Sequence, residues 1–210
     1  MAHLHPTAEL AERALLPDDP GQALALTRVL FAQTPRMFNH HRGLWGYTGM
    51  ASDGAPLTVQ STGIGGASAA VVVGELAALG LRRAVRIGRA WAAEESLRAG
   101  ELVAAGAVIA CDGASRALGA ARRLVPDAAL TRALRGDREG ELASVDLPES
   151  APPAGAVAFD LESAAVLAAA ARAGIPAACL VAVEGEEDAE GVAERLGLGA
   201  LPALAPTRTR

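Results

Sequence analysis

A glycine-rich turn followed by an arginine is the stretch of this chain best suited to bind a ligand. The turn is Gly63-Ile64-Gly65-Gly66, and Arg86 lies near the end of the next apolar run. A glycine turn alone is more often a plain turn than a phosphate cradle. The functional interpretation therefore depends on the elements that bring the turn and the arginine together.

The flanking residues predict a strand, a helix and a second strand. Residues 57–61 are β-prone, residues 67–79 are mostly good helix formers, and Gly80 stands where a capping glycine is expected. Residues 83–87 have the apolar character of a buried strand. A right-handed crossover of this kind places the turn and Arg86 at the carboxyl ends of neighbouring parallel strands, where open α/β sheets bind ligands.

The rest of the chain alternates short apolar runs with helix-forming segments. We expect further strands over residues 13–16, 36–41, 46–50, 101–110, 155–161 and 177–183. We expect helices over residues 21–33, 115–124, 128–134, 163–173 and 189–196. This alternation predicts an α/β fold with a mixed or parallel central sheet. The length favours one domain over residues 1–210, with a tail that frays from about residue 201.

Composition argues against several kinds of partner and chemistry. The net charge is −5 without a block of like charge, which disfavours a nucleic-acid partner. The chain has no lysine, so it can form neither a Walker-type phosphate site nor a Schiff base. No apolar run is long enough for a membrane span, and Cys111 and Cys179 form no CxxC pair. We therefore expect a cytoplasmic protein with reduced thiols and no membrane partner. Adjacent His40 and His41 would point to opposite faces of a strand, so we expect no metal site.

Six short motifs are informative because of their order. They are, along the chain, HPTAE from His5, LPDDP from Leu16, RGLWGYTG from Arg42, GIG from Gly63, RIG from Arg86 and DLESAA from Asp160. This set resembles the bacterial purine nucleoside phosphorylase and uridine phosphorylase family, whose pattern is HxxAE, PGDP, RGxxGFTG, a GxG loop, RVGS and EMEAA. The resemblance covers essentially the whole chain.

The resemblance implies a single-domain, three-layer α/β/α fold with a mixed central sheet. It also implies phosphorolysis of a purine or pyrimidine nucleoside to free base and ribose 1-phosphate, with inorganic phosphate as co-substrate and no cofactor. Such a reaction needs groups that hold phosphate, fix the ribose hydroxyls and protonate the departing base. Because the family forms hexamers built from dimers, a homo-oligomer is expected, either a dimer or a hexamer of dimers.

The resemblance assigns roles to five residues. Arg86 matches the family's phosphate arginine, and Gly65 belongs to the glycine loop beside the phosphate. Arg42 matches a second phosphate arginine, which the neighbouring subunit lends. His5 matches a histidine that reaches across the same interface to the ribose 5′-hydroxyl. Glu162 matches the glutamate that holds the ribose 2′- and 3′-hydroxyls.

Other positions depart from the family pattern. Asp18 replaces a glycine whose backbone faces the phosphate, while Asp19 keeps the place of the family's aspartate. A carboxylate about 4 Å from a phosphate dianion costs several kcal/mol at an effective dielectric constant of about 20. Gln22 stands for an arginine and Arg89 for a serine, both phosphate-binding positions in the family. Gly185 aligns with the aspartate that serves as general acid for purines.

Two groups of residues could compensate for these changes. Arg89 either pairs with Asp18 and closes the phosphate site or replaces the lost arginine as an anion ligand. Glu184 or Glu186, beside Gly185, could substitute for the missing acid.

Three functions remain open at this point. The first is an active but divergent nucleoside phosphorylase. The second is a catalytically impaired homologue that binds a nucleoside or nucleotide, or that serves as a partner subunit. The third is a nucleoside hydrolase of the same fold, in which Asp18 or Asp19 activates water.

Overall fold

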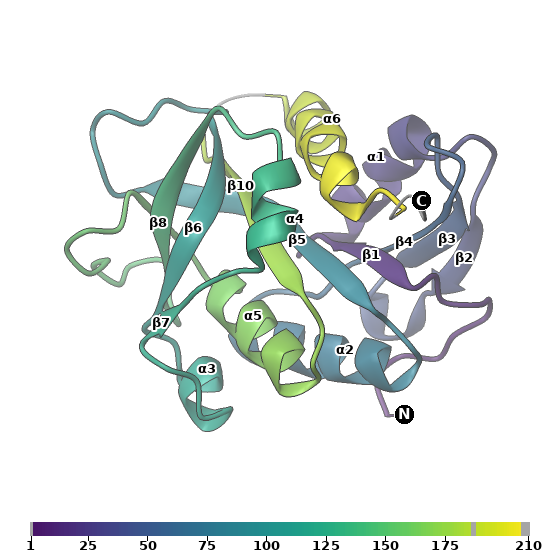
Figure 1. Ribbon diagram of the computed structural model, residues 1–210, viewed down its shortest axis with the longest axis horizontal. Helices are drawn as coiled ribbons and strands as arrows, with labels where there is room; N and C mark the ends of the chain where they lie inside the picture. Colours follow the sequence, from purple (N-terminus) through teal and green to yellow (C-terminus); the bar gives the residue numbers. More distant parts are fainter. Residues whose placement is uncertain (1, 186–187, 207–210) are drawn as a thin grey trace.

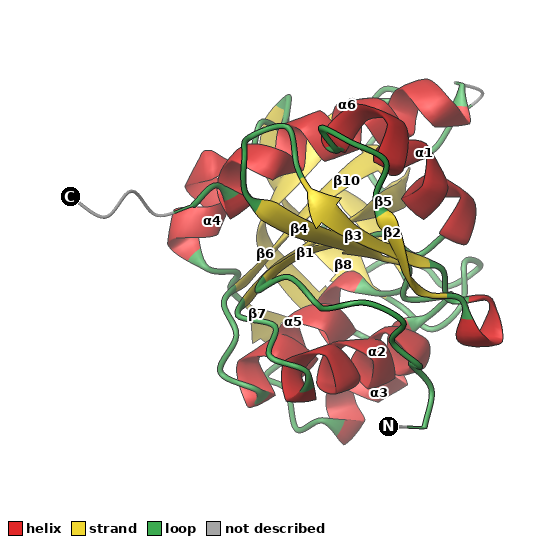
Figure 2. Cartoon of the chain, turned by 90° about the vertical axis from the view of Figure 1, so that its right-hand side faces the viewer, coloured by secondary structure: helices red, strands yellow, loops and turns green. Residues whose placement is uncertain are grey.

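The computed structural model describes residues 2–185 and 188–206, which form a ten-stranded mixed sheet between two layers of helices (Figures 1 and 2). The strands are β1 (Arg13–Leu16), β2 (Arg36–Asn39), β3 (Gly46–Met50), β4 (Pro56–Gln60), β5 (Arg83–Ala92), β6 (Leu102–Ala110), β7 (Arg123–Leu124), β8 (Arg138–Ser144), β9 (Ala158–Asp160) and β10 (Ala177–Val183). The helices are α1 (Pro20–Leu30), α2 (Gly66–Ala78), α3 (Gly113–Ala117), α4 (Ala128–Ala133), α5 (Ser163–Arg172) and α6 (Ala189–Ala200), with 3₁₀ turns η1 (His41–Gly43) and η2 (Leu201–Leu204). This three-layer arrangement confirms the expected fold class.

The long strand β5 organises the sheet. It pairs in parallel with β1 over Arg83–Arg86 on one side and with β10 over Ala84–Ala90 on the other. Its last residues, Trp91 and Ala92, pair antiparallel with β9. Strands β6 and β8 complete the path from β10 to β9, while β4, β3 and β2 extend the sheet beyond β1. The carboxyl ends of β1, β5 and β10 therefore lie next to one another.

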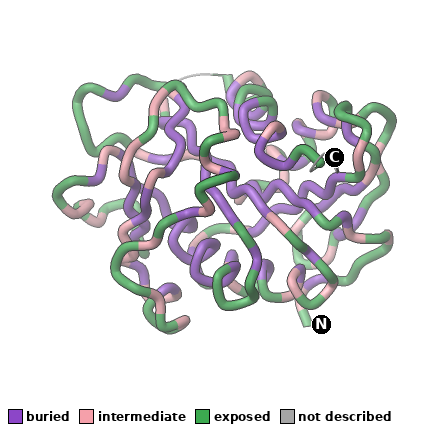
Figure 3. The backbone as a smooth tube through the Cα atoms, viewed as in Figure 1, coloured by how far each residue is buried: buried purple, intermediate pink, exposed green. Residues whose placement is uncertain are grey.

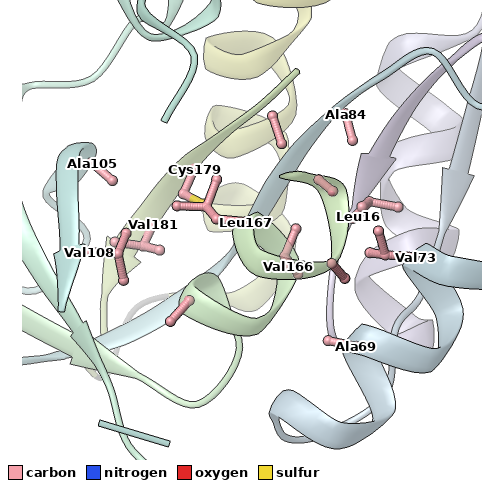
Figure 4. Packing of buried hydrophobic residues seen from close by; sticks show 14 of the residues in the cluster. Leu16, Ala69, Val73, Ala84, Ala105, Val108, Val166, Leu167, Cys179 and Val181 are labelled. Atoms are coloured by element: carbon pink, nitrogen blue, oxygen red, sulfur yellow. The ribbon is translucent and has the colours of Figure 1, made fainter. Parts of the chain in front are cut away.

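Helices α2, α3 and α5 cover one face of the sheet, and α1, α4 and α6 cover the other (Figures 1 and 2). Buried residues follow the sheet and the inner sides of these helices (Figure 3). On the α2 and α5 side, Leu16, Val73, Val166 and Cys179 belong to one hydrophobic cluster (Figure 4). Strand β10 is continuously apolar and buried along its whole length, as expected for a central strand covered on both faces.

The structure corrects two expectations in the middle of the chain. The helix expected over residues 115–124 is wrong beyond Ala117, because Gly119 takes a φ of +74° and the chain then forms β7. Strand β8 was not expected, because its partly exposed first half is polar and charged. Pairing with β6 and β9 on its two sides makes this segment a strand in spite of its composition.

The expected frayed tail is wrong for Leu201–Leu204. These residues form η2, in which Leu201, Ala203 and Leu204 are buried. Residues 207–210 lie outside the described part of the chain. Within that part, no helix is long and apolar enough to cross a bilayer.

Candidate functional site

A cavity of about 580 Å³ lies where the carboxyl ends of β1, β5 and β10 meet helices α1 and α6. Asp18 follows β1, Arg89 lies on β5 and Glu184 follows β10. The other described residues of the lining are Asp19, Gly21, Gln22, Leu24, Ala25, Arg28, Ala189 and Glu190. The cavity is therefore at the edge of the parallel strands where an α/β sheet binds ligands.

The loop after β1 separates the roles of its two aspartates. Asp19 is the N-cap of α1, and its carboxylate accepts the backbone N–H of Gln22 over 2.6 Å. The carbonyl oxygen of Asp18 accepts the N–H of Gly63, which ties this loop to the glycine turn. The side chain of Asp18, in contrast, is directed toward Arg86, with Oδ1 3.7 Å from Nη2. Asp19 is thus engaged in capping, and Asp18 faces the site.

The guanidinium of Arg86 is almost completely buried, with 1% of the residue exposed. Its Nη2 donates a hydrogen bond to Glu162 Oε2 over 2.7 Å and lies 3.4 Å from Asp160 Oδ2. Burial alone would lower the pKa of Arg86, but the carboxylates of Asp160, Glu162 and Asp18 together raise it. Arg86 therefore stays charged, although its Nε and Nη1 have no hydrogen-bond partner among the described residues.

Glu162 links this arginine to the glycine turn. Its Oε1 accepts the backbone N–H of Gly65 over 2.7 Å, while Oε2 accepts Arg86. Burial raises the pKa of Glu162, and the attraction of Arg86 opposes this shift. The structure therefore brings together the sequence-predicted residues Arg86, Gly65 and Glu162. Their polar groups, however, are hydrogen-bonded to one another.

A second buried carboxylate, Asp160, is held by hydroxyl groups. Ser144 Oγ donates to its Oδ1 over 2.6 Å, and Ser163 Oγ donates to its Oδ2. Burial, with a further contribution from Asp160, raises the pKa of the neighbouring Cys179 to about 12. The thiol of Cys179 therefore remains protonated at neutral pH and cannot act as a nucleophile.

Arg89 pairs with Glu184, not with Asp18. The Arg89 Nη1 to Glu184 Oε1 distance is 2.9 Å, and both side chains are partly exposed. The expectation of an Asp18–Arg89 ion pair is therefore wrong, since Asp18 approaches Arg86 instead. Serving as a proton donor would require Glu184 to break this pair. Glu186, the other candidate acid, lies outside the described residues.

A second, exposed ion pair lies in the cavity lining. Arg28 from α1 donates to Glu190 from α6 over 2.8 Å. Sequence reasoning missed these two residues, because only the packing of α1 against α6 brings them together. In the described lining, each guanidinium thus already contacts a carboxylate.

His5 and Arg42 are not among the described residues that line the cavity. His5 is exposed, and its ring stacks on His41 with centroids 3.8 Å apart. Arg42 is exposed in η1 and adopts a φ of 59°. Their expected roles across a subunit interface remain predictions.

Glu75 holds the segment that carries His5. Its carboxylate accepts the backbone N–H groups of Ala2, His3 and Leu4, and Nδ1 of His3 lies 2.9 Å from Oε1. Burial alone would raise the pKa of Glu75, but these hydrogen bonds outweigh it and lower the pKa to about 2. In the described part of the chain, no cluster of three or more His, Cys, Asp and Glu side chains is suited to a metal ion.

Comparison with known proteins agrees with the motif order. The family model described as "Phosphorylase superfamily" matches residues 12–147. A DeoD-type purine nucleoside phosphorylase of Clostridium perfringens is 35% identical over 96 residues, which are 45% of this chain and 40% of that protein. Uridine phosphorylases of Haemophilus influenzae and Escherichia coli are each 34% identical over 105 residues, which are 50% of this chain and 40% of theirs. The matched part thus spans about 40% of the length of these curated relatives.

Proposed function

Because the chain belongs to the phosphorylase superfamily, we propose that it cleaves the N-glycosidic bond of a nucleoside, with water as the acceptor of the ribosyl group in place of phosphate. The relatives named above are purine nucleoside and uridine phosphorylases, which supports a nucleoside as the substrate. One observation carries the choice of water. The carboxylate of Asp18 lies 3.7 Å from Arg86, at the position where the resemblance places an incoming phosphate.

Electrostatics disfavours phosphate at this position. Two like unit charges about 4 Å apart repel by about 4 kcal/mol at an effective dielectric constant of about 20, and a phosphate dianion roughly doubles that cost. Arg86 would offset this repulsion, but it is shared among Asp18, Asp160 and Glu162. The other guanidiniums of the described lining, Arg28 and Arg89, contact Glu190 and Glu184.

Asp18 has the properties of a general base for water. It lines the cavity, and burial raises its pKa above the usual aspartate value in spite of the attraction of Arg86. A raised pKa strengthens the carboxylate as a proton acceptor. In the proposed step, the water oxygen bonds to the ribose C1′ and a water proton passes to Asp18. The C1′–N bond breaks, its electron pair leaves with the base, and the departing base takes up a proton from solvent to give the free base.

Glu162 has a positioning role in this proposal. It holds Arg86 and the Gly65 N–H together, and only 4% of the residue is exposed. To hold ribose hydroxyls as the resemblance implies, it would have to release one of these partners.

Base release with and without phosphate tests the proposal. The protein is incubated with purine and pyrimidine nucleosides, and free base, ribose and ribose 1-phosphate are separated by chromatography. We expect base and ribose to form at the same rate whether or not phosphate is present. Base release that requires phosphate, accompanied by ribose 1-phosphate, would overturn hydrolysis in favour of phosphorolysis.

A second candidate function is nucleoside binding without turnover. The mutual hydrogen bonds of Arg86, Glu162 and Gly65 favour it, because they occupy groups that a catalytic site would offer to substrate. Nucleoside binding measured by calorimetry, with no base released at high protein concentration, would establish this function and exclude hydrolysis.

A further inference from the structure

The cavity at the ends of β1, β5 and β10 is acidic. Its described lining contains the carboxylates of Asp18, Asp19, Glu184 and Glu190 and the guanidiniums of Arg28 and Arg89. Because Arg28 contacts Glu190 and Arg89 contacts Glu184, the formal charge that remains belongs to Asp18 and Asp19.

The wall behind Asp18 does not neutralise this charge. Arg86 approaches Asp18, but it is hydrogen-bonded to Glu162 and lies 3.4 Å from Asp160. Arg86 and the three carboxylates around it, Asp18, Glu162 and Asp160, together carry more negative than positive charge. The potential in the cavity therefore favours a positively charged ligand.

A second observation concerns the leaving group. A neutral nucleoside base departs as an anion unless an acid protonates it. In the described lining there is no histidine, lysine, cysteine or tyrosine, and Glu184 and Glu190 are engaged by arginines. A base that is already cationic departs as a neutral molecule and needs no proton.

We infer that the preferred substrate is a nucleoside whose base carries a positive charge on the ring bonded to ribose, such as an N-alkylated purine or a pyridinium riboside. This inference rests on the proposed hydrolysis at the same site. Leu24, Ala25 and Ala189 supply apolar surface for the ring, and about 580 Å³ is within the usual size range of small-molecule sites.

The bond changes balance without a further reactant. The water oxygen forms a bond to C1′, and a water proton passes to Asp18. The C1′–N bond breaks toward the cationic nitrogen, and its electron pair neutralises the ring. The products are ribose and a neutral base.

The pair of 7-methylguanosine and guanosine tests the inference at pH 6, where the methylated base is cationic. For each nucleoside, kcat/KM is divided by the uncatalysed hydrolysis rate, which corrects for the weaker bond of the cation. We expect the corrected value to be at least about tenfold higher for 7-methylguanosine. A corrected value that is equal or higher for guanosine overturns the inference, while hydrolysis itself still stands.

Two variants of the exposed ion pair on the cavity wall form a matched control. Glu190→Gln removes a negative charge, and Arg28→Gln removes a positive charge. One unit charge at roughly 6 Å changes binding between about threefold and about a hundredfold for dielectric constants of about 80 and 20. We expect Glu190→Gln to lower the preference for the cation and Arg28→Gln to raise it. Shifts in the same direction in both variants, or no shift in either, contradict an electrostatic origin.

If neither nucleoside is cleaved, the proposed hydrolysis fails and binding of the same pair decides the charge preference. Calorimetry at pH 6 then compares their dissociation constants in the wild-type protein and in the two variants. A site for cationic nucleosides is supported if 7-methylguanosine binds more tightly than guanosine, and if Glu190→Gln lowers this preference while Arg28→Gln raises it. Equal binding of the two nucleosides overturns it.

Discussion

Arg86 donates a 2.7 Å hydrogen bond to Glu162, and Glu162 accepts the backbone N–H of Gly65 with its other oxygen. This relationship joins β5, the glycine turn and the start of α5. The groups expected to bind phosphate and ribose are therefore bound to one another, and both side chains are buried.

Replacing Arg86 should destabilise the protein strongly. Removing one partner of a buried ion pair costs about 3–5 kcal/mol, because the charges left behind, here those of Asp160 and Glu162, stay buried. We expect Arg86→Gln to lower the free energy of unfolding by about 3 kcal/mol, measured with urea. Glu184→Gln, at the partly exposed pair with Arg89, should cost about 1 kcal/mol or less. Equal effects of the two variants would mean that the buried pair contributes no more than an exposed one.

Asp18 should be important for catalysis, whereas the neighbouring Asp19 should not. Asp18→Asn removes the proposed base and should slow base release by about 10²–10⁴-fold. Asp19→Asn keeps an oxygen that can accept the Gln22 N–H, so α1 remains capped and the rate should change only a few-fold. Steady-state kinetics checks both, with circular dichroism to confirm folding. A larger loss in Asp19→Asn would transfer the role of base to Asp19.

The pH dependence of the rate should follow Asp18. Burial raises its pKa, and a general base works only when deprotonated, so activity is present above that pKa and is lost as the pH falls through it. We expect the acidic limb of kcat/KM to have its midpoint above about 3.9, the ordinary aspartate value. A limb at or below that value would show that Asp18 is not the titrating group.

Arg13 should anchor the chain after α6. Its guanidinium donates to both carboxylate oxygens of Asp53, to the Leu204 carbonyl oxygen and to the carbonyl oxygens of Ala55 and Pro56. Lysine cannot reproduce this planar set, so we expect Arg13→Lys to destabilise the protein by about 3 kcal/mol.

Hydrogen exchange gives a local measurement of the same contact. In Arg13→Lys, amide exchange over Leu201–Leu204 should accelerate, because η2 loses its hydrogen bond to β1. Arg82→Lys, a change at an exposed arginine, is the control. It should leave unchanged both the free energy of unfolding and the amide exchange over Leu201–Leu204. Unchanged exchange in Arg13→Lys would show that packing of Leu201 and Leu204 alone holds η2.

Glu75 should make the docking of the N-terminal segment sensitive to acid. Its pKa is lowered to about 2 in the folded protein, so the stability that it contributes is present above its ordinary pKa, near 4.3. That contribution is lost as the pH falls from about 4.3 to about 2. Glu75→Gln should remove this part of the pH dependence of unfolding, whereas Glu9→Gln, at an exposed position of the same segment, should retain it. If unfolding depends on pH in the same way in the wild type and in Glu75→Gln, Glu75 does not hold the N-terminal segment as proposed.

The sequence was sufficient for the fold class and for most elements near the site. The apolar runs that became β1, β5 and β10, and the glycine turn before α2, are local signals with local causes. They also predicted that the glycine turn and Arg86 would meet at one edge of the sheet, whereas the family resemblance assigned Glu162 and the loop of Asp18 to the same site. Strand β8 was not predictable in this way, because partners on both sides make a polar segment extended.

Tertiary structure alone decided which charged groups pair. Nothing local directs Asp18 to Arg86 or Arg89 to Glu184, because side chains far apart in the sequence meet only after the strands and helices have packed. The ordered η2 is a similar case, since its contact with Arg13 joins the two ends of the described chain. The types of residue at the site could thus be predicted from the sequence. Their pairing, and with it the charge of the cavity, came from the packing of distant elements, because ion pairs depend on distances that no local pattern encodes.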